Sequence, residues 1–156
     1  RTGLHNPAQG KSIRVKRVSA PPWVTRSAAF RKDSLSRQRP AAKPPPAYSQ
    51  AVKAAGLVFV SGTAPTDPAT GTYAGPTIQE QTRQCFKNIQ AILEEAGSSL
   101  DKIVSVTIVL ADEDDFAGMN EEWLKWFPSN PPARQGAKLP ARVPGLKVSI
   151  AAIAEA

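Results

Sequence analysis

A single arginine, Arg134, follows a pair of prolines in a segment that predicts a well-fixed side chain. Pro131 and Pro132 restrict φ and remove two backbone donors, so the chain should reach Arg134 in an extended form, at the start of a strand. A guanidinium held there offers a planar set of donors to a carboxylate or phosphate and stays charged at any working pH. An arginine at a strand end is more often simply solvated. Other residues of the chain are therefore needed to distinguish an anion-binding arginine from a solvated one.

Hydroxyls, amides and backbone groups are the other polar groups that such a site could use. They are the side chains of Tyr48, Ser61, Asn120 and Gln135, and backbone groups near Gly62 and Gly136. Together with Arg134, this set could hold a small anion and polarise it. It could not carry out demanding acid and base chemistry unaided.

Several kinds of catalytic centre are excluded for the chain from residue 48 onward. The single histidine, His5, lies before that point, and Cys85 is the single cysteine. Histidine-dependent triads, zinc sites with histidine ligands and thiolate metal clusters are therefore excluded. No GxxxxGK[ST] loop or GxGxxG motif is present to cradle a nucleotide. The acids at 112–115 are interpreted as the solvated, dipole-stabilising start of a helix, so we expect neither a metal nor a cofactor.

Positive charge is concentrated in the first third of the chain. Residues 1–47 contain eleven of the twenty Lys and Arg residues, one acid and seven of the fifteen prolines. Because the whole chain carries +7 and this part carries +10, the remainder carries −3. We interpret residues 1–46 as a basic, Pro/Arg-rich extension, either a mitochondrial targeting sequence, translated upstream sequence or a solvated linker, and 47–156 as one domain.

Cellular location is suggested by what the sequence contains and lacks. One cysteine excludes an internal disulfide framework and agrees with a reducing compartment. No apolar stretch is long enough for a membrane span, so we expect no membrane partner. These features predict a protein of the cytoplasm or the mitochondrial matrix.

Apolar periodicity predicts the elements that must position Arg134. A helix is expected over 77–96, where Thr77 and Glu80 form a capping box and Cys85 lies on the apolar face as a core thiol. A second helix should begin at the acids 112–115, with its aromatic residues covering a sheet. Alternating or β-branched runs predict strands at 48–54, 57–62, 103–110, around Arg134 and at 146–154.

This order of elements predicts an α+β fold, a mixed sheet with two helices on one face. The opposite face would be bare, although it should carry much valine, isoleucine and alanine. Such a surface usually has a partner, so we expect an oligomer.

Five short segments resemble the RidA/YjgF family, whose members include endoribonuclease L-PSP-like and imine deaminase proteins. The combination of a Tyr-Ser-Gln start with a Pro-Ala-Arg motif is specific, although either alone would be weak. The resemblance spans residues 47–155. The segments are YSQAV at 48–52, LVFVSG at 57–62, EQTRQ at 80–84, AGSSL at 96–100 and NPPAR at 130–134.

The resemblance implies a chorismate-mutase-like fold, in a homotrimer whose sheets line a central barrel with three clefts between subunits. It implies a 2-iminobutanoate/2-iminopropanoate deaminase-like hydrolase, which converts reactive enamines and imines such as 2-aminoacrylate to 2-oxo acids and ammonia without a cofactor. By position, Arg134 is similar to the arginine that grips the substrate carboxylate. Tyr48 and Ser61 match hydroxyls that line the cleft, Asn120 a neighbouring polar group, and the backbone of Gly136 the group beside the imine and water.

Two positions depart from the family pattern. Gly136 stands where the family often has cysteine, which widens the pocket and loosens the backbone. Ala151 stands where active deaminases usually carry a glutamate in the last strand, in a pattern like Ile-Glu-Ala-Ile-Ala. Ala151 therefore removes a carboxylate that could order water and relay a proton.

The sequence suggests three competing hypotheses about function. The first is a deaminase of small 2-imino acids anchored by Arg134, with activity that the loss at Ala151 would reduce. The second is a non-catalytic trimer that binds small carboxylates or a protein partner. The third, an RNA-acting protein, is disfavoured because the domain carries −3 and has no histidine.

Overall fold

The computed structural model describes residues 48–140 and 142–156. The predicted extension over 1–46 lies outside these residues. The expected order of strands and helices is confirmed in the described part. The main elements are β1 Ala51–Ala54, β2 Leu57–Thr63, α1 Ile78–Glu95, β3 Ile103–Leu110, α2 Phe116–Trp126, β4 Ala133–Lys138 and β5 Val148–Glu155, with short 3-10 turns η2 Leu100–Lys102 and η3 Glu113–Asp115.

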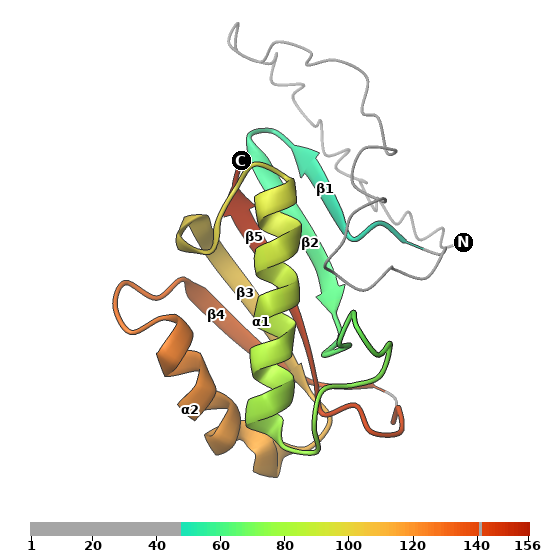
Figure 1. Cartoon of the computed structure of the whole chain (residues 1–156). Helices are drawn as coiled ribbons and strands as arrows, with labels where there is room; N and C mark the ends of the chain where they lie inside the picture. Colours follow the sequence, from blue (N-terminus) through green and yellow to red (C-terminus); the bar gives the residue numbers. More distant parts are fainter. Residues whose placement is uncertain (1–47, 141) are drawn as a thin grey trace, which may run out of the picture. The chain divides into compact units, whose positions relative to one another are not determined.

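The five strands form one sheet in the order β1-β2-β5-β3-β4. β3 and β4 are parallel, and the other neighbouring pairs are antiparallel. A parallel pair needs a crossover connection, and α2 provides it, running beside β4 (Figure 1). The crossover brings α2 over the edge strand that carries Arg134.

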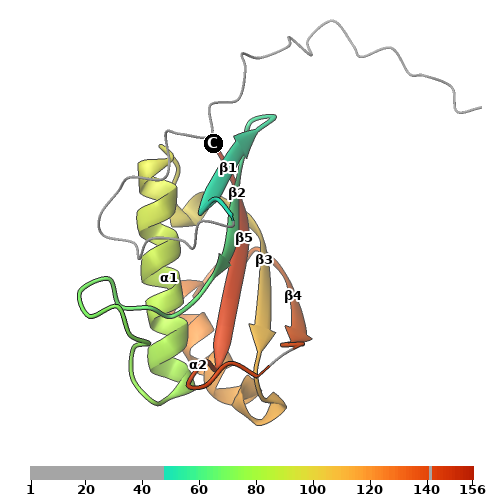
Figure 2. The same cartoon turned by 90° about the vertical axis from the view of Figure 1, so that its right-hand side faces the viewer.

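Both helices cover the same face of the sheet, and the other face carries no helix (Figure 2). Alternation along the strands explains this arrangement: Val106, Ile108 and Ile150 are buried under the helices, and the residues between them are half-buried on what we call the open face. Phe59 on this open face is 39% exposed. The predicted α+β fold with two helices on one face is confirmed.

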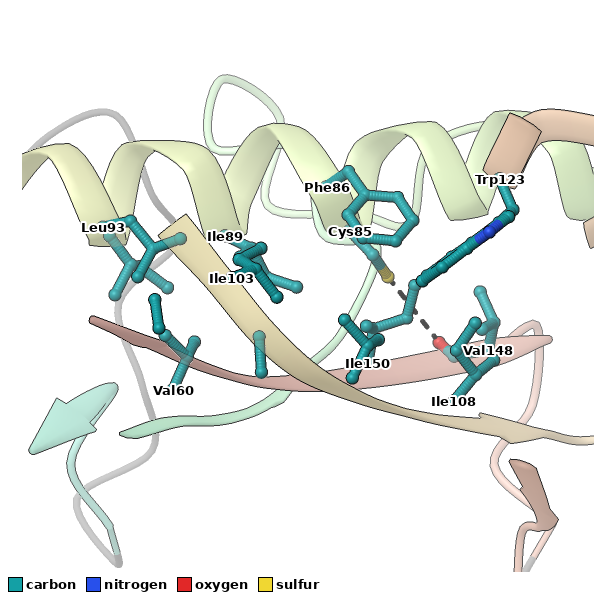
Figure 3. Close-up of a cluster of buried hydrophobic side chains, with 14 of the residues drawn as sticks. Val60, Cys85, Phe86, Ile89, Leu93, Ile103, Ile108, Trp123, Val148 and Ile150 are labelled. Carbon is teal, nitrogen blue, oxygen red and sulfur yellow. Dashed lines mark hydrogen bonds between the residues drawn. The ribbon is translucent and has the colours of Figure 1, made fainter. Parts of the chain in front are cut away.

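Helix α1 begins and packs as its sequence predicts. The Thr77 hydroxyl accepts a hydrogen bond from the Glu80 backbone, and the Glu80 carboxylate accepts one from the Thr77 backbone at 3.0 Å, which forms the expected capping box. Cys85 lies in the core between α1 and the sheet, with its thiol directed at the Val148 carbonyl (Figure 3). Cys85 is fully buried, so the core interpretation is confirmed, and burial raises the pKa of its thiol.

The acids before α2 do not cap that helix as expected. The Asp112 side chain accepts a hydrogen bond from the Asp114 backbone at 3.1 Å and so caps the separate turn η3. Helix α2 begins at Phe116, and its N-cap residue Asp115 makes no side-chain capping bond. Asp115 instead pairs with Lys147 at 3.1 Å, because the turn directs this carboxylate toward the start of β5. The described residues include no helix that is both long and apolar enough to cross a bilayer.

A buried carboxylate joins the two helices. Glu122 of α2 is 2% exposed and accepts hydrogen bonds from Arg83 Nε at 2.9 Å, Arg83 Nη2 at 2.8 Å and Lys125 Nζ at 3.0 Å. Burial alone would raise the pKa of the Glu122 carboxyl, but the hydrogen bonds from Arg83 and Lys125 outweigh burial, so its pKa is lowered. The two cations remain 42% and 62% exposed.

Replacing Glu122 with Gln should lower the free energy of unfolding by about 2 kcal/mol at pH 7, because charged hydrogen bonds are lost. Since the folded pKa is lowered, this contribution is present above the ordinary value of 4.5 and disappears as the pH falls through the folded pKa. Urea unfolding at fixed protein concentration, at pH 7 and pH 3, measures both effects. Glu121→Gln, its exposed neighbour, is the control and should change stability by less than about 0.5 kcal/mol. Equal unfolding midpoints for the two variants at pH 7 would show that the hydrogen bonds of Glu122 do not stabilise the fold.

Candidate functional site

The edge strand β4 presents alternate residues to opposite faces of the sheet. Arg134 stands beside Val106 in the parallel register and faces α2. The next residue, Gln135, faces the open side, where its amide donates to the Thr107 hydroxyl at 2.9 Å. Arg134, Gly136 and Lys138 therefore share the helix-covered face. The extended approach predicted from Pro131 and Pro132 ends at Ala133, where β4 begins.

Two side chains of α2 hold the Arg134 guanidinium. Its Nη1 donates to Asn120 Oδ1 at 2.7 Å, and its Cζ lies 4.8 Å from the centroid of the Trp123 ring. The Phe116 ring is 6.0 Å away. A cation over an aromatic face is attracted by the ring, and the hydrogen bond orients one end of the fork. Arg134 itself remains exposed, so its other donors can meet an anion.

A pocket of about 600 Å³ opens beside Arg134, between β4 and the beginning of α2. Its opposite end carries Lys138, which pairs with Glu113. Their hydrogen bond raises the pKa of Lys138 and lowers that of Glu113, so both remain charged at neutral pH. The space between these charged ends is mainly apolar. The lining residues are Ile108, Leu110, Glu113, Phe116, Met119, Arg134, Gln135, Gly136, Ala137 and Lys138.

The predicted site residues form two groups in one chain. Arg134, Asn120 and Gly136 lie together on β4 and α2, whereas the Gln135 amide points to the open face. Ser61 and Gly62 lie on β2, which is separated from β4 by β5 and β3. Three strand spacings amount to about 14 Å, so a small molecule on Arg134 cannot also reach β2 in the same chain.

The second group surrounds an irregularity near the end of β2. Strand β2 shifts register against β5 between Val60 and Thr63, which leaves Ser61 and Gly62 opposite Ala151. The Ser61 hydroxyl donates to the Ser49 carbonyl at 2.7 Å. Such a bulge re-aims side chains, and here it places Ser61 beside the residue that follows Tyr48.

Tyr48 precedes β1 and is 50% exposed, which leaves its ring available to a partner surface. Ala151 lies on the open face, opposite Thr107 of β3. Ser149, two residues earlier on the same face, has its hydroxyl 3.2 Å from where a Cβ on Gly62 would lie. The group on β2 and β5 therefore contains the hydroxyls of Tyr48, Ser61 and Ser149, and residue 151 supplies no carboxylate to it.

Two aromatic residues of α2 belong to the site, although the sequence predicted only that they cover the sheet. Trp123 is buried as expected, but its ring also supports the guanidinium. The expectation that Phe116 covers the sheet is wrong: Phe116 is 51% exposed and lines the pocket, because it occupies the first turn beside the sheet edge. The spacing of Phe116, Asn120 and Trp123 on one helical face was the signal that linked them.

The Glu113 and Lys138 pair was not predicted, since the two residues lie far apart in the sequence and meet through the parallel register. No group of three or more His, Cys, Asp or Glu side chains within 48–140 and 142–156 is placed to hold a metal ion. The charged groups that line the pocket are the Arg134 guanidinium and the paired side chains of Lys138 and Glu113.

Comparisons with known proteins agree with the fold and with the resemblance. A family model described as endoribonuclease L-PSP matches residues 37–156. The chain is 35% identical over 128 residues to a mouse 2-iminobutanoate/2-iminopropanoate deaminase, covering 82% of this chain and 93% of that protein. It is 44% identical over 110 residues to "Protein mmf1, mitochondrial" of Schizosaccharomyces pombe, covering 69% and 67% of the two chains.

Among solved structures, RidA from an Antarctic Psychrobacter bacterium has 34% sequence identity and a TM-score of 0.72. The match covers 78% of this chain and 98% of that one. The resemblance of five short segments to the RidA/YjgF family is therefore confirmed.

Replacing Arg134 with Ala should weaken binding of 2-oxobutanoate about a hundredfold, or roughly 3 kcal/mol, because two charged hydrogen bonds are lost. Lys lacks the planar fork and should recover part of that loss. Isothermal titration calorimetry measures each dissociation constant. Arg142→Ala, at an exposed arginine outside the pocket, is the control and should bind as the unchanged protein does. Equal affinity in the Arg134→Ala protein would remove Arg134 from the anion site.

Proposed function

Because this chain belongs to the family described as endoribonuclease L-PSP, we propose that it hydrolyses small 2-imino and enamine acids to 2-oxo acids and ammonia. Its substrates would include 2-aminoacrylate and 2-iminobutanoate. The observation that carries this proposal is the Arg134 guanidinium, held by Asn120 and Trp123 at the mouth of a pocket with an apolar wall. The name of the mouse relative supports the same reaction class.

The main contribution of the protein to this reaction would be to position the substrate and a water molecule. The substrate carboxylate would bind the free donors of Arg134, which places C2 near the backbone of residues 135 and 136. Water adds to C2 of the imine, the nitrogen takes up protons, and ammonia leaves as the carbonyl of the 2-oxo acid forms. No electron leaves or enters the substrate, so the balance requires no redox cofactor.

A second copy of the chain would complete the site. Tyr48 and Ser61 lie near the β1 edge of the sheet, whereas Arg134 lies on the β4 edge. No helix covers the open face between these edges (Figure 2). A trimer whose sheets face a common centre would cover that surface and bring the Tyr48 and Ser61 hydroxyls of one copy to Arg134 of the next. The same assembly would place three equivalent clefts between subunits.

Ala151 supports a second candidate, a trimer that binds small carboxylates or a protein partner without turning substrate over. The residue lies opposite Ser61 and Gly62 and brings no carboxylate to order water. Arg134 would still bind an anion in that case. The mitochondrial relative supports a mitochondrial matrix location for either function, with the cytoplasm as the alternative. An RNA-acting role gains no support from the charge of −3 carried by residues 48–156.

Hydrolysis of 2-iminobutanoate separates these candidates. An amino acid oxidase generates the imine, and semicarbazide competes for it, so a slower formation of semicarbazone reports enzymatic hydrolysis. We expect slow turnover by the unchanged chain, abolished by Arg134→Ala. Absence of turnover together with Arg134-dependent binding of 2-oxobutanoate would favour the binding function.

Ala151→Glu should raise the hydrolysis rate at least about tenfold, because general acid or base assistance is typically worth more than that. Ser149→Glu is the matched variant, since it adds the same carboxylate to the same face two residues earlier. An increase with Ser149→Glu alone would show that the position for activating water lies beside Gly62 and that the assignment to Ala151 is wrong.

A site shared between copies should be restored by mixing two defective chains. Arg134→Ala and the double variant Tyr48→Phe, Ser61→Ala would be unfolded and refolded together in equal amounts. A working site needs Arg134 from one copy and Tyr48 with Ser61 from the next. Random assembly combines these two intact halves in about a quarter of the sites, so about a quarter of the activity should return. The two proteins refolded separately and then mixed are the control. No recovery after joint refolding would contradict a shared site.

A further inference from the structure

The pocket beside Arg134 is longer than a minimal imino acid requires. Arg134 and Lys138 are four residues apart on one strand, which corresponds to about 13 Å. The carboxylate, C2 and imine nitrogen of a substrate on Arg134 would occupy the near end. Ile108, Leu110 and Phe116 line the stretch between that end and the Lys138 and Glu113 pair. Ile108 and Leu110 are buried, but Phe116 is 51% exposed, so a substrate with a methyl side chain would leave the Phe116 ring in contact with water.

Gly136 lies between Arg134 and Lys138 on the same face, and the fold does not require glycine there. Its φ is not in the left-handed region, unlike that of Gly75 at 64°. A Cβ at residue 136 would lie 3.7 Å from the Ile108 carbonyl oxygen, which is an ordinary van der Waals contact. At Gly75, by contrast, a Cβ would overlap the Glu80 side chain. The structural consequence of glycine at 136 is therefore the space it leaves in the pocket.

Charge favours an apolar occupant over a charged one in that space. Lys138 is already paired with Glu113, so neither end group offers a free charge to a substrate side chain. The walls between the two charged ends are aliphatic or aromatic. Burying each additional methylene against them strengthens binding several-fold.

We propose that the pocket over Gly136 selects 2-imino acids with extended apolar side chains, such as those formed by oxidation of leucine or methionine. The inference rests on the proposed function, because it identifies the substrate class of the same site. Gly136 acts as a specificity-determining residue: its missing side chain admits the substrate chain, and residues 108, 110 and 116 contact it. The carboxylate stays on Arg134 for short and long substrates alike.

The test compares long and short substrates on the full chain. The ratio of kcat/KM for the leucine-derived imine to that for the alanine-derived imine is measured in the semicarbazide assay. Calorimetry measures the same preference without turnover, as the affinity for 4-methyl-2-oxopentanoate relative to pyruvate. Both ratios should exceed about ten in the unchanged chain. Gly136→Ala should lower them several-fold, and Gly136→Val should bring them to one or below.

Ala133→Val is the matched control, because it adds bulk to the same strand on the opposite face and should leave the ratios unchanged. The Gly136→Ala variant keeps the test decisive even if the valine variant fails to fold. Equal binding of the two 2-oxo acids by the unchanged chain, or ratios that do not respond to Gly136→Ala, would overturn the proposal. Preferential binding without turnover of any imine would overturn the proposed deaminase function and leave the pocket assignment supported.

Discussion

The parallel pairing of β3 with β4 is the constraint on which the candidate site depends. Because parallel neighbours require a crossover, helix α2 must return across the sheet and lies against the strand that it precedes. Asn120 and Trp123 thereby come under the guanidinium of Arg134. An antiparallel edge strand joined by a short turn would leave Arg134 without this support.

The buried carboxylate of Glu122 serves the same arrangement from the other side of α2. Its hydrogen bonds from Arg83 tie α2 to α1, and α1 is fixed to the sheet by a core that includes Cys85 and Phe86. The Trp123 ring packs against Phe86 with centroids 5.8 Å apart. The surface that supports Arg134 is therefore continuous with the core, which limits its movement relative to β4.

The two faces of the sheet differ in what covers them. The helix-covered face forms the core and, at its β4 edge, the pocket that contains Arg134. The open face carries Ser61, Ala151 and Gln135 and has no helix over it. A site that used both Arg134 and Ser61 would have to take them from two copies of the chain, because the two residues of one chain cannot meet across the sheet.

Local patterns in the sequence determined the helices and strands and singled out Arg134 as the candidate anchor. Alternating and β-branched runs specified the strands, Thr77 and Glu80 specified the start of α1, and two prolines before Arg134 specified an extended entry into β4. These features depend on neighbouring residues, so they can be read without tertiary contacts. The motif around Arg134, combined with the Tyr-Ser-Gln start at Tyr48, was also sufficient to indicate the family.

Tertiary structure alone decided which side chains meet. The pairing of Lys138 with Glu113, the ring of Trp123 under Arg134 and the exposure of Phe116 all arise where α2 crosses β4. The separation of Ser61 from Arg134 follows from the order of strands, which no local pattern specifies. Hydrophobic periodicity reports which face of an element is buried, but the partner against which it is buried is set by the packing of the whole chain.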